Sequence, residues 1–356
     1  MSDQPKPQYR EHYFPNTEEL GTHEMRVTAL GTGRPFLRPA QANAGWLVEL
    51  GNGDKFMFDF GFGTQTNFAA LEIPYERMTA YFATHLHTDH VGDFPQIWVG
   101  SWVGGRLVPL EVYGPSGPEP KYGMKHFVDK IREAYAWDTD TRVGFLPAVG
   151  AEINVHEFEY SKVHVVYDRN GVKITSFPAV HIYDGPVSFR LEWNGLVFVY
   201  SGDTTPSWFM VENAMNADIV IHDTYNTVSQ LVAKSGYDER SARSMAGYVH
   251  SLPNEAGRVF DLIKPRLAVG FHFFNDFDTA PEMASEIRKN YSGPLALAKD
   301  LMVFNITREQ IVTRMAVTSS HVWPSRPDNG KAFQQAPRKE KMKMSPWLSD
   351  KQVFPK

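Results

Sequence analysis

The sequence predicts an α/β protein in which two mixed β-sheets lie face to face between helices, an αββα sandwich. Two observations lead to this class. Apolar, strand-like segments recur in both halves of the chain, and the last two of them each follow a stretch with helical spacing. Strands paired with helices in both halves are typical of two packed sheets with helices on their outer faces. The 356 residues, 42% of them hydrophobic, suffice for a large core.

The first half of the chain opens with β structure. Strands are expected in residues 25–33 and 78–85, and residues 45–61 have the pattern of two strands joined at the turn Gly51-Asn52-Gly53. Residues 121–137, KYGMKHFVDKIREAYAW, carry apolar side chains at helical spacing. We therefore expect four strands before a long helix.

The second half continues with apolar strands. Asn194-Gly195 is a tight hairpin signal between two of them. The final two strands follow helical stretches, as in α/β proteins. Strands are expected in residues 171–181, 187–195, 196–204, 216–225 and 265–274.

The sequence has one candidate domain with a polar segment at each end. Residues 1–24 are polar and contain three prolines, which predicts an arm lying on the surface, and residues 25–317 form the domain. Residues 318–356 are rich in Pro and Lys and include PRKEKMKM. A charge run of this kind indicates a solvated or partner-wrapping tail rather than a nucleic-acid arm. Such a tail is suited to clasping a neighbour in a homo-oligomer or to covering a site.

Composition excludes several classes of protein. The formal net charge of -5 gives no overall attraction to a phosphate backbone, so nucleic acid is not the favoured partner. The absence of cysteine excludes disulfides and thiolate metal sites. No apolar run of membrane length and no signal-peptide pattern occurs, which predicts a cytoplasmic protein without membrane association.

The segment FATHLHTDHVGD, residues 82–93, concentrates polar residues at the end of a predicted strand. His85 and His87 are two apart, so on extended backbone both side chains point the same way and can reach one metal ion. Asp89 and His90 follow where the chain turns, and they point at a neighbouring position. This spacing predicts two metal ions; the alternative is a polar strand end with hydrogen-bonded histidines.

The HLHTDH motif resembles the metal-binding signature of the metallo-β-lactamase superfamily. That resemblance implies an αββα sandwich with a dinuclear site, usually of zinc, at one edge of the sheets. Three further residues match the family pattern, each just after an apolar strand: His181, Asp203 and His272. Taken singly, His181 is better explained as a structural histidine and Asp203 as a capping residue. Their order and strand-end context agree with a single template.

The resemblance implies a ligand set. His85, His87 and His181 would bind the first metal, Asp89, His90 and His272 the second, and Asp203 would lie between them. Imidazole and carboxylate ligands suit two Zn²⁺ per chain, although Mn²⁺ and Fe²⁺ fit the same ligand types. The flavin-associated di-iron branch has Glu at the position of His87, which argues against redox iron. Asp59 resembles the family aspartate that supports the histidine loop; a turn aspartate is the alternative.

The segments with the Gly-Thr-Gly turn at 31–33, IVIHDTYN at 219–226 and YVHSLPNEAG at 248–257 occupy the places of characteristic segments in one branch of the superfamily. Residues 25 to about 305 thus resemble the ribonuclease Z and arylsulfatase-like branch. By position, His250 would be a proton donor or a transition-state stabiliser near the metals, oriented by Asp223 or His222. Asp223 stands where the branch has Glu, one methylene longer, and a capping role is the alternative for His250. The segments FHFFNDFDTAPE and SFRLEWNG also resemble a bacterial subgroup of hydrolases labelled guanitoxin-biosynthesis-like.

These features predict a dinuclear zinc hydrolase that uses a metal-bridging hydroxide on a small-molecule ester, lactone or related substrate. In that interpretation Asp89, His250 and Asp223 take part in catalysis. One alternative is ribonuclease Z-type cleavage of tRNA precursors, which the net charge and the lack of an evident Gly/Lys-rich arm disfavour. The other alternative is a metal-binding scaffold without turnover.

Overall fold

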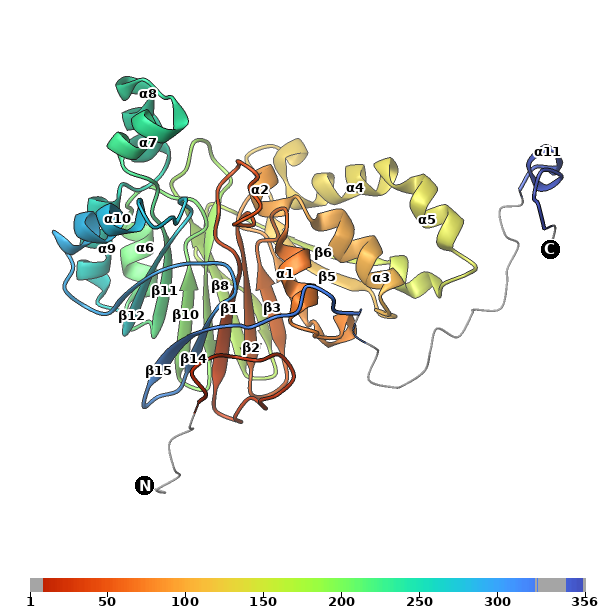
Figure 1. The fold of residues 1–356 in the computed structure, drawn as a ribbon, viewed down its shortest axis with the longest axis horizontal. Coiled ribbons are helices and arrows are strands. Elements are labelled where there is room, and N and C mark those ends of the chain that lie inside the picture. Colours follow the sequence, from red (N-terminus) through yellow and green to blue (C-terminus); the bar gives the residue numbers. More distant parts are fainter. Residues whose placement is uncertain (1–8, 324, 326–343, 355–356) are drawn as a thin grey trace.

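The computed structural model describes residues 9–323, 325 and 344–354 (Figure 1). Two β-sheets pack face to face, with helices on their outer sides, so the predicted αββα sandwich is confirmed. Most of the segment 318–356, including all but the last residue of PRKEKMKM, and residues 1–8 of the predicted arm lie outside the described residues. Within the described part, no helix is both long and apolar enough to span a membrane.

The first sheet has eight strands and is half antiparallel, half parallel. In spatial order, the first five strands pair antiparallel with one another and the last four pair parallel, so the fifth strand belongs to both parts. In spatial order the strands are β15 (Ile311–Met315), β14 (Met302–Ile306), β1 (Met25–Gly31), β2 (Gly45–Leu50), β3 (Lys55–Phe58), β4 (Ala80–Phe82), β5 (Leu110–Pro115) and β6 (Ile153–Phe158).

The second sheet has seven strands and is mixed in the same way. Its first four strands are parallel and its last four antiparallel, with one strand shared between the halves. In spatial order they are β13 (Leu295–Leu297), β12 (Leu267–Phe271), β11 (Ile219–Asp223), β10 (Leu196–Tyr200), β9 (Val187–Trp193), β8 (Val172–Pro178) and β7 (His164–Arg169). The β9–β10 turn has positive φ at Asn194 (52°) and Gly195 (76°), the hairpin that the Asn-Gly pair predicts.

Helices cover both outer faces of the sandwich. In Figure 1 the helices α1 to α5 lie beside the first sheet and α6, α9 and α10 beside the second, while α7 and α8 project from one corner. Their bounds are α1 (Thr64–Ala70), α2 (Thr88–Val91), α3 (Ser101–Val103), α4 (Met124–Ala134), α5 (Ala136–Arg142), α6 (Trp208–Ala214), α7 (Val228–Ser235), α8 (Glu239–Ser244), α9 (Pro253–Ile263), α10 (Ala280–Arg288) and, near the C-terminus, α11 (Pro346–Ser349). The helix expected over residues 121–137 is therefore divided at Tyr135 into α4 and α5.

The hydrophobic core fills three layers, because the central strands are covered on both faces. Trp46 points between the sheets and its neighbour Leu47 points toward the helices of the first sheet, and both are fully buried. Alternate side chains thus serve different layers, which explains why these strands have continuous apolar runs rather than polar alternation. Phe58 makes tilted ring contacts with Phe189 and Phe198 of the second sheet. Aromatic packing therefore joins the sheets beneath their common edge.

The described part of the N-terminal segment contacts the domain. Tyr13 is buried, and its backbone pairs with residues 315–317 at the end of β15. Arg314 donates to both carboxylate oxygens of Glu18, each at 2.9 Å. These contacts lay residues 9–24 along the edge of the first sheet, on the surface of the domain.

Candidate metal centre

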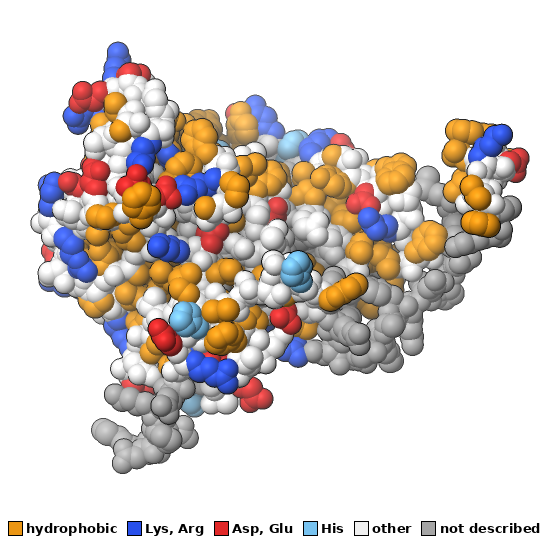
Figure 2. All heavy atoms as spheres, viewed as in Figure 1, with side chains coloured by type: hydrophobic (Ala, Val, Ile, Leu, Met, Phe, Trp, Pro, Cys, Tyr) orange, Lys and Arg blue, Asp and Glu red, His pale blue; other side chains and the backbone are white. Residues whose placement is uncertain are grey.

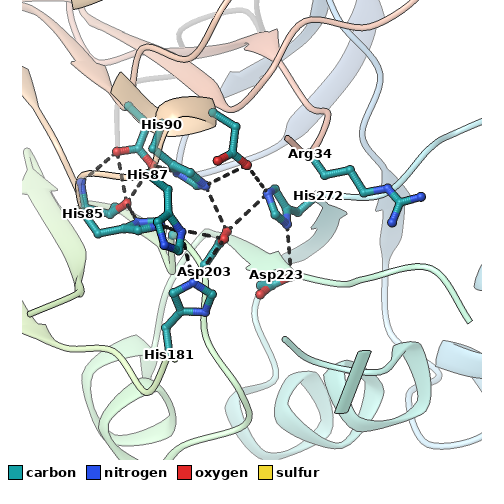
Figure 3. Close-up of polar contacts among 12 residues, drawn as sticks. Arg34, His85, His87, His90, His181, Asp203, Asp223 and His272 are labelled. Carbon is teal, nitrogen blue, oxygen red and sulfur yellow. Dashed lines mark hydrogen bonds and ion pairs between the residues drawn. The ribbon is translucent and has the colours of Figure 1, made fainter. Parts of the chain in front are cut away.

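Seven His and Asp side chains gather at one edge of the sandwich, although they come from the ends of four separate strands. His85 and His87 follow β4, and Asp89 and His90 lie in the short helix α2. His181 follows β8, Asp203 follows β10 and His272 follows β12. Their ring and carboxylate groups converge on a single cluster (Figure 3). The structure thus brings together every residue of the predicted ligand set.

The first group consists of three histidines and one carboxylate oxygen of Asp203. His87 Nδ1 lies 3.0 Å from His85 Nε2 and 3.3 Å from His181 Nε2. Asp203 Oδ2 lies 3.9 Å from His85 Nε2 and 3.8 Å from His181 Nε2. Four donors at 2.0–2.1 Å from a tetrahedral zinc ion are roughly 3.4 Å apart. The spacing of these atoms therefore fits one metal ion.

The second group uses the other carboxylate oxygen of the same aspartate. Asp203 Oδ1 lies 3.2 Å from His90 Nε2 and 3.5 Å from His272 Nε2. Asp89 Oδ2 lies 3.1 Å from His272 Nε2 and 3.6 Å from His90 Nε2. Because Oδ1 and Oδ2 of Asp203 face different groups, this one carboxylate can bridge two adjacent ions.

Unsatisfied buried atoms indicate that this cluster is built for cations. His90 Nε2 and Asp203 Oδ1 have no hydrogen bond of normal geometry within the described residues, although both are buried. A buried polar atom without a partner costs about 1–3 kcal/mol, more if charged. A divalent ion between them would remove that cost. The imidazole and carboxylate ligands suit zinc and other divalent first-row ions.

The pKa values in the first group favour metal binding as well. Burial lowers the pKa of His85, His87 and His181, so their rings are neutral near pH 7. A neutral imidazole has the free lone pair that a metal ligand needs. Burial alone would raise the pKa of Asp203, but His272 and His90 lower it well below the usual range. Asp203 is therefore an anion.

Asp59 supports the histidine loop through a network of short hydrogen bonds. Its Oδ2 lies 2.7 Å from His90 Nδ1 and accepts from the Tyr200 hydroxyl at 2.7 Å. Its Oδ1 accepts from the Thr84 amide at 2.7 Å, and Thr84 Oγ1 lies 3.0 Å from His85 Nδ1. A carboxylate on one ring nitrogen directs the other toward the metal position. Neither Thr84 nor Tyr200 belongs to a sequence motif, and their supporting role becomes apparent only from their positions beside Asp59 in the structure.

The chain takes unusual backbone conformations at this edge. Asp59 has φ 56° and His272 has φ 72°, in the left-handed region that side chains other than glycine rarely adopt. At Gly61 a Cβ would lie 1.9 Å from the Asp89 carbonyl oxygen, so only glycine lets α2 approach the loop after β3 this closely. Strained residues held by surrounding structure are concentrated at functional sites.

His250 and Asp223 form a pair against the same cluster. His250 Nδ1 lies 2.8 Å from Asp223 Oδ2 and 3.8 Å from Asp203 Oδ2. Burial opposes protonation, but Asp223 raises the pKa of His250 above its ordinary value. The Tyr225 ring lies flat on the His250 ring, with centroids 4.3 Å apart and an interplanar angle of 4°. Tyr225, for which the sequence pattern predicts no role, thus holds His250 from one side.

The structure separates His222 from this pair. His222 Nδ1 lies 2.7 Å from the Asp223 carbonyl oxygen, and its ring packs against Phe260 of α9. Successive residues of a strand point to opposite faces, so His222 faces the helices when Asp223 faces the cluster. Of the two residues expected to orient His250, Asp223 is the one whose side chain reaches it.

Comparison with known proteins identifies the family. Residues 37–233 match the model of the metallo-β-lactamase superfamily. The chain is 31% identical to a ribonuclease Z of Mycobacterium marinum, over 65% of this chain and 80% of that protein. It is 32% identical to a ribonuclease Z of Mycolicibacterium paratuberculosis, over 56% of this chain and 69% of the relative.

Solved structures agree on the fold. The metallo-β-lactamase fold protein YhfI from Bacillus subtilis has a TM-score of 0.59 at 18% identity, covering 80% of this chain and 100% of its own. The short form of human tRNase Z has a TM-score of 0.58 at 20% identity, covering 78% of this chain and 98% of its own. This chain therefore belongs to the metallo-β-lactamase superfamily of metal-dependent hydrolases, in its ribonuclease Z-like branch.

Proposed function

We propose that this hydrolase cleaves phosphodiester bonds with two divalent metal ions, zinc by preference. The observation that carries the proposal is the placement of Asp203 between two imidazole groups, with the His250–Asp223 pair against it. The names of the curated relatives, each a ribonuclease Z, support the bond type. In this proposal phosphodiester cleavage takes precedence over the small-molecule ester hydrolysis expected from the sequence.

The ligand residues would hold the ions and leave one side of the site for substrate. His85, His87 and His181 would bind the first ion, Asp89, His90 and His272 the second, and Asp203 both. When bound, paired divalent ions supply a hydroxide nucleophile near neutral pH and stabilise charge on a phosphoryl oxygen. Asp59 would keep the His90 ring oriented through its Nδ1.

His250 would act as the proton donor in this reaction. The Asp223 carboxylate accepts the Nδ1 proton of His250, which leaves Nε2 to exchange a proton with the substrate. Because the pKa of His250 is raised, its ring stays protonated up to a higher pH than a free imidazole does. Proton delivery to the leaving alkoxide oxygen would complete the cleavage.

Metal analysis and substrate assays test the proposal together. We expect close to two zinc ions per chain in purified protein, and metal-dependent cleavage of bis(4-nitrophenyl) phosphate and of a precursor tRNA at its 3′ side. His87→Ala should lose both activities, whereas His126→Ala, on the exposed face of α4, should retain them. Protein that stays near zero metal after zinc addition, or zinc-loaded protein that cleaves neither diester, would contradict the proposal.

Hydrolysis of a small ester or lactone is the second candidate. Two observations favour it: exposed apolar side chains flank two of the site histidines, and acidic and basic side chains are interspersed on the face shown in Figure 2. The apolar residues are Ile182 and Tyr183 beside His181, and Tyr248 beside His250. Turnover of aryl esters and lactones by zinc-loaded protein, without cleavage of either diester, would establish this candidate instead.

A further inference from the structure

We propose that Arg34 forms an anion subsite beside the metal centre, which binds a second phosphate or carboxylate group of the substrate. The inference rests on the proposed function, since it assigns that substrate an anionic group besides the one that reacts. Arg34 lies in the loop after β1, and Figure 3 shows it next to His272 with its guanidinium on the side away from the histidine cluster.

The Arg34 guanidinium is buried without enough acceptors. The residue is 1% exposed, and its Nη2 donates to Ser235 Oγ at 3.2 Å. Its Nε and Nη1 make no hydrogen bond of normal geometry among the described residues, although the Tyr225 hydroxyl lies near enough to interact with the guanidinium. Burying a charged group without partners is costly, and folded proteins usually pair such groups with an acid. Two unused donors on a fixed planar fork match the oxygens of a phosphate or carboxylate.

The surroundings of Arg34 provide aromatic faces but no counter-ion. The guanidinium carbon lies 4.2 Å from the Phe274 ring centroid, 4.8 Å from that of Tyr225 and 5.4 Å from that of Phe36. Within the described part of the chain no salt bridge to Arg34 is formed, and the nearby Asp276 accepts from Arg38 Nη1 at 3.1 Å. The aromatic faces hold the cation while its charge remains available to a ligand.

The subsite is connected to the reactive groups through one aromatic ring. Tyr225 stacks on His250 at 4.3 Å and lies 5.9 Å from the His272 ring, and Arg34 packs over the same tyrosine ring. A substrate whose reacting phosphate lies at the metal ligands would therefore pass Tyr225 to reach Arg34. The half-exposed Phe36 packs over the guanidinium from the solvent side, so its ring would have to move as an anion enters.

Sulfate binding tests the subsite without depending on catalysis. In the full-length, metal-loaded protein we expect sulfate to raise the melting temperature, and Arg34→Met to lose much of that rise. Without sulfate, Arg34→Met should be at least as stable as the wild type, because it removes a buried charge with unused donors. Arg38→Met is the matched control, since it removes a neighbouring arginine that already has Asp276 as its partner.

A pair of dinucleotides then tests the role in substrate recognition. Wild-type enzyme should cleave pUpU with a kcat/KM about tenfold higher than UpU, the size expected for a charged hydrogen bond. Arg34→Met should lose this preference, so that its kcat/KM values for pUpU and UpU become nearly equal, while Arg38→Met should keep the preference. If Arg34→Met does not fold, Arg34→Gln carries the same comparisons.

The two proposals fail in different ways. If no variant cleaves either dinucleotide, the phosphodiesterase proposal is contradicted, while the sulfate measurement still decides the fate of the subsite. If Arg34→Met melts well below the wild type and its sulfate response is unchanged, Arg34 is a structural residue and the inference is overturned. An equal preference for pUpU in wild type and Arg34→Met would overturn it as well.

Discussion

At the scale of single residues, Asp203 joins the two halves of the site. One carboxylate oxygen faces His85 and His181, and the other faces His90 and His272. The HLHTDH motif identifies four of the seven proposed ligands by itself. The other three are isolated residues, each of which has an ordinary structural explanation until the fold places it beside the motif. The assignment of all seven as metal ligands stays a prediction, supported by these distances.

Asp59 should control metal affinity through His90. Asp59→Asn replaces an acceptor for His90 Nδ1 with an amide, so we expect the affinity for the second metal to fall about 10–100-fold. Chelator competition measures this affinity. Tyr200→Phe, which removes only one donor to Asp59, is the control and should bind metal nearly as tightly as the wild type. Equal metal affinity in Asp59→Asn and wild type would show that this hydrogen bond does not position the ring.

His250 should affect the rate but not the metal content. Its Nδ1 is held by Asp223, so His250→Gln removes a proton donor and leaves the seven proposed ligands in place. We expect kcat to fall by about 10²–10⁴-fold, the usual contribution of general acid–base catalysis. Elemental analysis should still find the wild-type metal content. Loss of one metal ion from this variant would instead make His250 a ligand, an arrangement that its proximity to Asp203, Asp223 and His272 permits.

At the scale of elements, the site depends on the ends of strands. The central strands are apolar on both faces, and their sequences predict them well. The strands β5, β6, β7, β13, β14 and β15 are not expected from the sequence. β5 and β14 are mostly buried, whereas β6 and β7 are partly exposed with mixed side chains such as INVHEF and HVVYDR. Such strands carry no continuous apolar run, because polar residues are tolerated where one face meets solvent. The loops after β4, β8, β10 and β12 were expected from the sequence, since each follows a predicted strand.

The loop after β1 is held to the domain by the carboxylate of Asp300, whose pKa is raised. Asp300 accepts from the amides of Thr32 and Ala42 and from Asn67, and the Thr32 carbonyl in turn accepts from the His272 amide. Burial raises the pKa of Asp300 to about 6, although these hydrogen bonds oppose the shift. The protonated form is therefore favoured by folding.

This pKa shift predicts a pH-dependent difference between wild type and Asp300→Asn. A folded pKa above the unfolded one gives a stability contribution that is complete below about pH 4 and is lost as the pH rises through about 6. Relative to Asp300→Asn, the wild type should gain on the order of 2 kcal/mol between pH 7 and pH 4. Urea unfolding of both proteins at several pH values measures this difference. A difference independent of pH would mean that Asp300 has an ordinary pKa in the fold.

At the scale of the whole molecule, the metal centre connects the two sheets. His85 and His87 extend from the first sheet, whereas His181, Asp203 and His272 extend from the second. The aromatic core lies beneath this edge, with Phe58 of the first sheet against Phe189 and Phe198 of the second. Ions bound between these loops would hold the sheets together at the open end of the sandwich.

Removal of metal should therefore destabilise the entire domain. A ligand that binds only the folded state at 1,000 times its Kd stabilises by about 4 kcal/mol. We expect EDTA to lower the melting temperature by several degrees and stoichiometric zinc to restore it, measured by calorimetry. Asp203→Asn should melt at a temperature that EDTA changes much less. A wild-type melting temperature that does not respond to EDTA would contradict a shared metal centre between the sheets.

The sequence by itself determined the class of fold, most of the strands that build its centre and the order of the candidate ligands. It did so because apolar runs and strand-end motifs are local features, readable within a few residues. Only the tertiary structure decided that Asp223, rather than His222, reaches His250, that Tyr225 stacks on that ring, and that Arg34 lies buried without an acid. These relations join residues far apart in the chain, and they depend on how loops cross the edge of the sheets, which no local pattern encodes.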